Sequence, residues 1–306
     1  MSPERNPPTL RHTSMGLRKM SGLRKTWLAL LLASGLSFGL APPLLAAESD
    51  SSQSGGGLTG SEEHAVPSRQ HWSFAGPLGK FDPEQLQRGY KVYHDVCSTC
   101  HSLKFLAFRD LADPEGPDFS DAQVKALAAT YKIEDGPNDS GAMFQRPGRP
   151  SDNFPWAFAN AEAAKAALGA VPPDMSLLAK ARTYARPFPL FIFDAVTEYQ
   201  EQGPDYIVAI LNGYTHPKDD HWNLYFPGHV IAMPRPLKDG AVQYTDGAPQ
   251  TLTQYSHDVA AFLYWAAEPK LEDRKKMGLR VIAFLIVFAV LLYFTKRRIW
   301  AGIPEH

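Results

Sequence analysis

Apolar residues gather into two long runs, one near each end of the chain. Residues 27–40 form the first run, and Pro42-Pro43 follows it closely. The second run extends from Met277 to Thr295, and Arg280 near its edge is its only charge. A helix of this length measures roughly 28 Å, close to the ~30 Å hydrocarbon core of a bilayer. The pattern therefore predicts one transmembrane helix at 277–295.

The first run has the features of a secretory signal peptide. Six basic residues precede it between Arg5 and Lys25, and Leu45-Ala46-Ala47 supplies the small side chains of a cleavage site. The run is short for a bilayer, although a membrane anchor is the alternative interpretation. We therefore expect residues 1–47 to be a signal peptide. The segment 48–70 begins with many serines and glycines, which is typical of a flexible linker.

Between the two runs, apolar positions recur at helical spacing and proline-rich segments separate them. Asp82 can cap a helix from Glu84, one face of which carries Leu86, Tyr90, Tyr93 and Cys97. Similar patterns predict further helices at 121–131, 161–168, 175–182, 206–211 and 254–267. No period-two alternation predicts a strand. We therefore expect a mainly α-helical domain with long loops at 71–276.

The first of these helices ends in the sequence Cys97-Ser98-Thr99-Cys100-His101, which contains the only two cysteines of the chain. Two thiols at this spacing with a histidine directly after them are the attachment signature of c-type haem. The thiols can add across the haem vinyl groups, and the imidazole can bind the iron. A zinc half-site needs a second Cys/His pair, and a redox dithiol needs a βαβ setting. We therefore expect one covalently attached haem c.

A haem that only transfers electrons needs a sixth iron ligand, and the methionines between the two apolar runs are Met143, Met175 and Met233. Met175 begins a predicted helix, where methionine commonly fills the core. Met233 precedes Pro234, which favours extended backbone and a stiff loop that can present a thioether. The residues alone leave Met233, Met175, a histidine or an open position as possibilities.

Charge is unevenly distributed, although the formal total is only −1. Residues 48–273 contain 30 acidic and 18 basic side chains, a balance of −12. Acidic residues concentrate at 110–121 and 134–139. A field of this sign favours encounter with a basic partner, although a solvated surface is the simpler explanation of each cluster. We expect a basic protein rather than a nucleic acid as the partner.

Several motifs together resemble the cytochrome c1 family, the haem subunits of cytochrome bc1 complexes. Beside the CxxCH, the resemblance rests on Leu86-Gln87-Arg88-Gly89, Pro172-Pro173-Asp174, Pro204-Asp205-Tyr206, Ala232-Met233-Pro234 and Trp265-Ala266-Ala267-Glu268-Pro269. These motifs extend over most of the chain. The resemblance implies a cytochrome c-type haem domain enlarged by long loops, followed by one C-terminal transmembrane helix.

The resemblance also implies roles for individual residues. It assigns thioether attachment to Cys97 and Cys100, axial ligation to His101 and Met233, propionate contacts to Arg182 and Tyr206, and a contact with the haem to Pro173. It implies electron transfer from a Rieske iron–sulfur protein to a soluble or anchored c-type cytochrome, beside cytochrome b. The chain itself would make and break no substrate bonds.

Export would place the haem domain in the bacterial periplasm and leave residues 296–306 as a cytoplasmic tail of a single-pass inner-membrane protein. Basic residues flank the transmembrane run on both sides, so the positive-inside rule does not fix its orientation. Two other functions remain open at this point: a free-standing anchored cytochrome and a haem enzyme with an open iron site. The single CxxCH argues against a haem enzyme.

Overall fold

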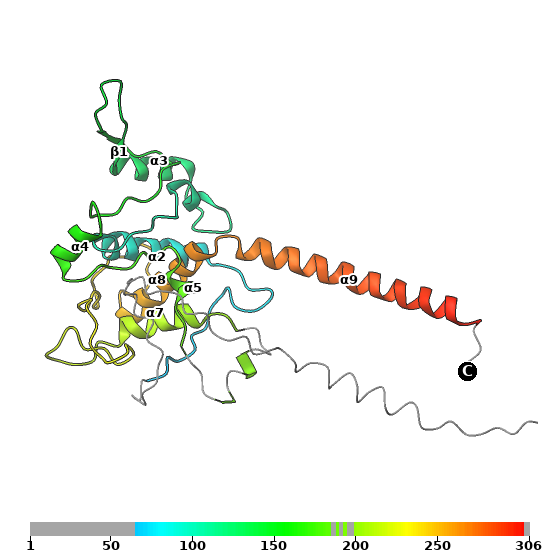
Figure 1. Cartoon of the computed structure of the whole chain (residues 1–306). Coiled ribbons are helices and arrows are strands. Elements are labelled where there is room, and N and C mark those ends of the chain that lie inside the picture. Colours follow the sequence, from blue (N-terminus) through cyan, green and yellow to red (C-terminus); the bar gives the residue numbers. More distant parts are fainter. Residues whose placement is uncertain (1–64, 185–187, 190–191, 195–198, 303–306) are drawn as a thin grey trace, which may run out of the picture. The chain divides into compact units, whose positions relative to one another are not determined.

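The computed structural model describes residues 65–184, 188–189, 192–194 and 199–302. Helices dominate these ranges, and Figure 1 traces them in sequence colours from cyan to red. The predicted signal peptide, residues 1–47, and most of the predicted linker, residues 48–64, lie outside the described residues. The mainly α-helical class expected from the sequence is confirmed for the described part of the chain.

The elements follow one another along the chain as α2 (Pro83–Asp95), η1 (Cys97–Thr99), η2 (Phe108–Ala112), α3 (Asp121–Thr130), β1 (Lys132–Asp135), β2 (Phe144–Pro147), α4 (Ala161–Leu168), α5 (Leu178–Ala181), α7 (Gln202–Asn212), α8 (Leu252–Ala267) and α9 (Leu271–Trp300). Each predicted helix has a counterpart among them. Helix α4 has the predicted bounds, because Asn160 caps its first turn and Gly169, with a φ of 77°, ends it.

Helices α5 and α7 differ most in length from the prediction. Helix α5 is shorter than 175–182, because the N–H of Met175 donates to the carbonyl oxygen of Ser102 at 2.8 Å and this part of the chain forms a turn. Helix α7 starts before the predicted Tyr206, since its first turn includes Pro204. Proline fits a first helical turn because its missing N–H would have no partner there.

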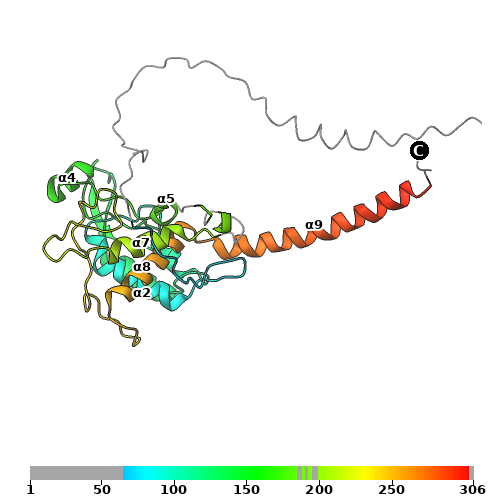
Figure 2. The same cartoon turned by 90° about the horizontal axis from the view of Figure 1, so that it is seen from below.

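Helix α8 lies between α2 and α7, as both Figure 1 and Figure 2 show. Phe262 and Trp265 of α8 are fully buried, as is Leu86 of α2. Gly89 lets α2 approach α8 closely, since a Cβ atom at this position would lie 2.1 Å from the carbonyl oxygen of Asp258. The CxxCH segment follows directly after α2. The packing of α2 against α8 therefore fixes where this segment begins.

Residues 132–147 contain two short strands that no alternation in the sequence predicted. Strands β1 and β2 pair in antiparallel register, with Lys132 opposite Pro147. Each has four residues and neither contains a fully buried side chain, so no alternation of apolar positions marks them in the sequence. Arg146 ties the ribbon to the domain, since its guanidinium donates to Asp135 at 2.5 Å and to Asp152 at 2.6 Å.

Helix α9 contains the predicted transmembrane run and extends beyond both of its ends. Its most apolar stretch has a mean hydropathy of 2.5, and none of that stretch is buried in protein. Within the residues described, it is the one helix long and apolar enough to cross a bilayer. The C-terminal membrane helix inferred from the sequence is therefore present.

Candidate functional site

The CxxCH motif follows α2 directly and begins with a tight turn. The carboxylate of Asp82 accepts bonds from two backbone N–H groups and fixes the start of α2, which ends at Asp95. The N–H groups of Cys100 and His101 then both donate to the carbonyl oxygen of Cys97, at 3.1 and 2.8 Å. Both cysteines are free and half-buried. The turn thus presents two thiols and an imidazole within five residues.

The imidazole of His101 is buried and held in one tautomer. Its Nδ1 lies 2.8 Å from the carbonyl oxygen of Pro173. A carbonyl oxygen can only accept, so Nδ1 carries the proton and Nε2 keeps a free lone pair. Burial lowers the pKa of His101, which favours the neutral ring. A neutral imidazole with an available Nε2 is the form that binds a metal.

The segment that contains Pro173 is fastened to the residues just after His101. The carboxylate of Asp174 accepts a bond from the Ser102 hydroxyl at 2.6 Å and one from the N–H of Lys104 at 3.0 Å. Burial alone would raise the pKa of Asp174, but these bonds outweigh it and lower the pKa. The charged carboxylate therefore holds the two segments together and keeps the Pro173 carbonyl in reach of the imidazole.

Two aromatic side chains hold carbonyl groups of the motif. The hydroxyl of Tyr93, on the buried face of α2, donates to His101 O at 3.1 Å, and the indole N–H of Trp156 donates to Cys100 O at 2.8 Å. The helical pattern placed Tyr93 on this face. Trp156 lies in a loop where no periodicity operates, so the sequence did not predict its role. Its only signal is its place in the aromatic stretch Phe154-Pro155-Trp156-Ala157-Phe158.

Met233 lies on a loop whose backbone is fixed at several points. Its carbonyl oxygen accepts a bond from the hydroxyl of the buried Tyr214 at 2.9 Å. The N–H of Ile231 donates to the carbonyl oxygen of His221 at 2.9 Å. The Met233 side chain is half-buried and packs against the same hydrophobic core as Cys97. Hydrogen bonds to Tyr214 and His221 thus hold the backbone of this loop at two points.

Other residues considered as iron ligands have structural contacts. Met175 is only 8% exposed and belongs to the hydrophobic core, although it lies in the turn before α5 rather than in a helix. The ring of His257 stacks on Trp72 with centroids 4.2 Å apart. Nδ1 of His94 lies 2.8 Å from a carboxylate oxygen of its neighbour Asp95.

Arg182 and Tyr206 come from different elements but act on one another. Helices α5 and α7 meet so closely that a Cβ atom at Gly203 would lie 1.6 Å from the carbonyl oxygen of Ala179. Arg182 follows α5 and is exposed, whereas Tyr206 on α7 is half-buried. Burial raises the pKa of Tyr206, and the nearby charge of Arg182 opposes that effect. The charge of Arg182 is therefore within electrostatic range of the Tyr206 hydroxyl.

The donor atoms suit a haem better than a bare metal ion. In the part of the chain that the structure describes, no three Cys, His, Asp or Glu side chains converge to hold a metal, and this includes the CxxCH residues. The thiols therefore remain available for separate bonds, and only the imidazole offers a ligand nitrogen. Val171 and Leu177, which flank the Pro173 segment, are about half exposed and suit contact with an apolar macrocycle.

The chain is similar to known proteins over most of its length. The Cytochrome C1 family model matches residues 72–303. Cytochrome b/c1 of Bradyrhizobium diazoefficiens is 57% identical over 244 residues, which are 77% of this chain but only 36% of that protein. Cytochrome c1 of Blastochloris viridis is 45% identical over 270 residues, or 85% of this chain and 93% of that protein. Cytochrome c1 of Rhodospirillum rubrum is 40% identical over 275 residues, or 82% and 93%.

The family match covers the CxxCH segment, the Met233 loop and the membrane helix alike. Together with these relatives it shows that the chain belongs to the cytochrome c1 family, the single-pass haem subunits of bc1 complexes, and carries one covalently bound haem c.

Proposed function

We propose that this chain accepts electrons from a Rieske iron–sulfur protein and passes them to a basic c-type cytochrome, with cytochrome b as its neighbouring subunit. In this proposal residues 1–47 are a signal peptide, and the haem domain, residues 71–276, lies in the periplasm. The observation that carries the proposal is the imidazole of His101, which Pro173 holds at Nδ1 and which offers Nε2 beside two free thiols.

Cys97 and Cys100 would form the thioether bonds, and His101 and Met233 would be the axial ligands. When bound, the haem supplies a reversible one-electron couple at its iron. Histidine/methionine ligation raises the reduction potential and leaves no open coordination position. Pro173 would keep the imidazole in one tautomer and lie against the haem. The stiff Met233 loop would keep the thioether in place in both oxidation states.

Arg182 and Tyr206 would contact the haem propionates. Their proximity supports this role, because a guanidinium and a phenol hydroxyl can both donate to a carboxylate. Arg182 is exposed in the structure, so its charge is available to a ligand. A propionate placed between the two side chains would be neutralised by one and hydrogen-bonded by both.

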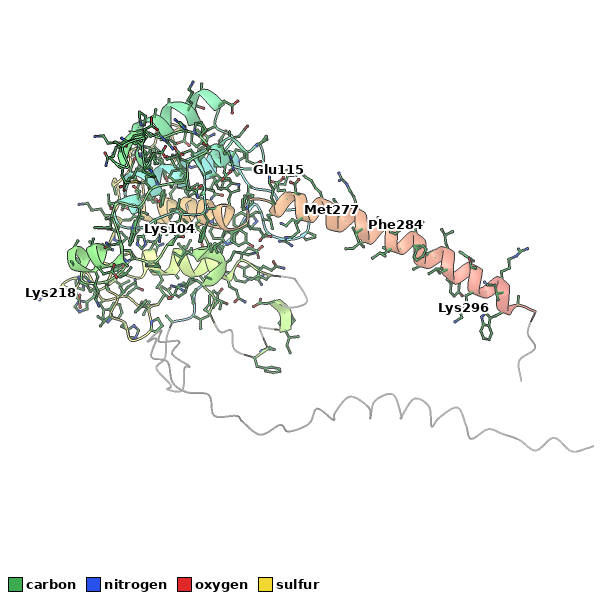
Figure 3. All side chains as sticks on the ribbon, turned by 45° about the horizontal axis from the view of Figure 1, so that its top comes forward. Lys104, Glu115, Lys218, Met277, Phe284 and Lys296 are labelled. Atoms are coloured by element: carbon green, nitrogen blue, oxygen red, sulfur yellow. The ribbon has the colours of Figure 1, made fainter. Side chains whose placement is uncertain are left out.

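Ion pairs fasten the start of α9 to the haem domain. Three basic residues there bind carboxylates of the domain, and we call these pairs the anchor cluster: Lys270 with Asp113, Arg274 with Glu268, and Lys276 with Glu115. Figure 3 shows Glu115 at this end of α9 and Lys296 at the other. For Lys296, Arg297 and Arg298 no ion pair occurs within the described residues. Basic residues thus flank the membrane run on both sides, so in this proposal export, rather than charge, places the haem domain in the periplasm.

The anchor cluster also refines where a basic cytochrome could bind. Asp113 and Glu115 are already neutralised by lysines beside the membrane run. Glu134 and Asp139, on or beside the β1–β2 ribbon, are exposed, and neither has an ion pair in the part of the chain described. The ribbon is therefore a better candidate than the 110–121 cluster for steering a cationic partner.

The iron ligation is tested by replacing Met233 with leucine in the full chain and recording spectra of solubilised membranes. Met233→Leu keeps the apolar volume but removes the sulfur, so the reduced haem should bind carbon monoxide and its potential should fall. Met175→Leu is the matched control and should do neither, because Met175 fills the core. An unchanged potential without carbon monoxide binding in Met233→Leu would contradict the assignment.

The place of the chain in a complex is tested by purification in a mild detergent. Haem bound to this chain should co-elute with cytochrome b and with quinol–cytochrome c reductase activity. Elution of the chain alone, with its haem still reducible, would favour a free-standing anchored cytochrome instead.

A further inference from the structure

A cleft of about 250 Å³ lies where α9 begins, between the haem domain and the first turns of the membrane helix. Glu201, which precedes α7, and Tyr264 of α8 line it from the domain. Helix α9 contributes Arg274, Lys275 and Gly278 to the lining of the cleft. It also contributes two apolar residues, Leu279 and Ile282. The haem-binding residues described above do not contribute to it.

The cleft has a charged end and an apolar end. Arg274 and Lys275 precede the apolar run that starts at Met277, so they lie at the level of lipid headgroups. Leu279 and Ile282 lie within the run and are 44% and 56% exposed. A phospholipid has the same division, because charged groups occupy its head and hydrocarbon follows within a few ångströms.

Both basic side chains at the charged end keep unused hydrogen-bond donors. Arg274 directs Nε and one terminal nitrogen to Glu268, at 2.6 and 2.5 Å, so its other terminal nitrogen has no partner among the described residues. Lys275 Nζ donates to the carbonyl oxygens of Phe74 and Gly79, at 2.5 and 3.3 Å, which leaves one of its three N–H groups. The unused N–H groups of Arg274 and Lys275 can both donate hydrogen bonds to the oxygens of one phosphate group.

The charged end also contains a buried carboxylate. Glu201 is 5% exposed, and the N–H of Gln200 donates to its Oε2 at 2.9 Å. In the described ranges no lysine or arginine forms an ion pair with it. Burial raises the pKa of Glu201, since nothing charged compensates its desolvation fully. A buried carboxylate of this kind is stabilised by a cation that can also donate hydrogen bonds.

We propose that the cleft binds the headgroup of a phospholipid with a primary ammonium, such as phosphatidylethanolamine, from the surrounding bilayer. The phosphate accepts bonds from Arg274 and Lys275, the ammonium donates to Glu201, and an acyl chain lies along Leu279 and Ile282. Phosphatidylcholine lacks the N–H donors for Glu201. An anionic headgroup such as phosphatidylglycerol would bring its negative charge towards Glu201 without a cation to compensate it.

The test uses the full chain in its detergent-solubilised complex, incubated with equal amounts of phosphatidylethanolamine, phosphatidylcholine and phosphatidylglycerol. Lipid retained after gel filtration is quantified per haem by mass spectrometry. The unmodified chain should retain the ethanolamine lipid in preference to both others. Glu201→Gln keeps the shape of the side chain and should reduce that preference about tenfold, the effect of losing one charge-assisted hydrogen bond.

Gly278→Leu is the second variant, because it fills the cleft without changing any charge. A Cβ atom at Gly278 meets nothing within 4 Å, and leucine is a better helix former than glycine, so the fold should tolerate the change. Retention of the ethanolamine lipid should fall about tenfold, as for Glu201→Gln. Arg280→Gln is the matched control, since Arg280 lies on the same helix outside the cleft, and it should leave retention unchanged.

The haem absorbance per chain reports folding of each variant and the haem site separately from lipid binding. Unchanged lipid retention in Gly278→Leu, or equal retention of all three lipids by the unmodified chain, would overturn the proposal. Loss of another subunit from Gly278→Leu at constant lipid content would also overturn it, because the cleft would then hold a segment of a partner protein.

Discussion

The buried carboxylate of Asp205 accepts a hydrogen bond from the indole N–H of Trp72 at 2.9 Å, across 133 residues of sequence. The same carboxylate accepts from the N–H of Gln70 at 3.0 Å and from the hydroxyls of Tyr184, at 3.1 Å, and Tyr199. Asp205 thus joins the start of the domain to α7 and to the segment before it. Tyr206 is the next residue on α7 and so lies directly beside this network.

Asp205→Asn should therefore destabilise the domain. The amide would direct N–H donors at groups that are themselves donors, so we expect a loss of at least about 2 kcal/mol in the free energy of unfolding. Chemical denaturation of the purified chain, followed by circular dichroism, measures this loss. Asp139→Asn on the exposed ribbon is the control and should change little. Equal effects of the two variants would show that the network contributes nothing.

A second prediction concerns the contact of α2 with α8. Gly89→Ala should destabilise the protein, although alanine improves helix propensity by about 1 kcal/mol. Its Cβ would lie 2.1 Å from Asp258 O and 2.6 Å from Phe262 Cβ, so the helices must separate at a cost of about 1–3 kcal/mol or more. Thermal unfolding of Gly89→Ala measures the balance, and a midpoint at or above that of the unmodified chain would contradict the close contact.

The third prediction is a loss of stability in acid at the β1–β2 ribbon. The bonds from Arg146 lower the pKa of Asp152 to about 2, below the ordinary value of about 3.9. The carboxylate therefore stabilises the fold above about pH 4, and this contribution disappears as the pH falls towards about 2. Asp152→Asn should be less stable at neutral pH and lose less on acidification. Parallel acid curves for the two proteins would show that the pair has no such effect.

The fourth prediction is that acidic residues differ in how they steer a basic cytochrome. Neutralising Glu134 and Asp139 together should slow the bimolecular reaction roughly threefold at low salt. The difference should vanish as the Debye length falls from about 30 Å at 0.01 M to about 10 Å at 0.1 M. Stopped-flow oxidation of the reduced chain measures both rates.

The matched control for that experiment is the pair Asp113→Asn and Glu115→Gln. It changes the net charge equally, but these carboxylates lie against lysines next to the membrane run. The control should alter the rate less than Glu134→Gln with Asp139→Asn. If the two double variants behave alike, the ribbon has no special part in docking.

Local signals explain which parts of the fold could be predicted from the sequence. Helix α4 has the predicted bounds because its caps, Asn160 and Gly169, lie next to it in the chain. Helix α5 is shorter than predicted because a distant partner, Ser102, takes the N–H of Met175. The ribbon was missed because its strands are short and largely exposed, and because the bonds of Arg146 to Asp135 and Asp152 follow no periodic pattern.

The candidate site also has a part that a local pattern predicts and a part that depends on contacts between distant residues. The spacing of the CxxCH residues is a local pattern, so Cys97, Cys100 and His101 could be named directly. The carbonyl of Pro173 and the indole of Trp156 act on that motif from 72 and 56 residues away. Periodic patterns in a sequence do not reveal contacts between residues that are so far apart in the chain. The resemblance to a family suggested Pro173, while Trp156 emerged only from the structure.

The anchor cluster, with Lys275 bound to the backbone beside it, stiffens the joint between domain and membrane helix. A haem domain on a loose tether could swivel and sample many heights above the bilayer. Here several bonds to separate parts of the domain oppose such rotation. A haem attached at Cys97 and Cys100 would therefore change its height above the bilayer or its tilt only together with α9.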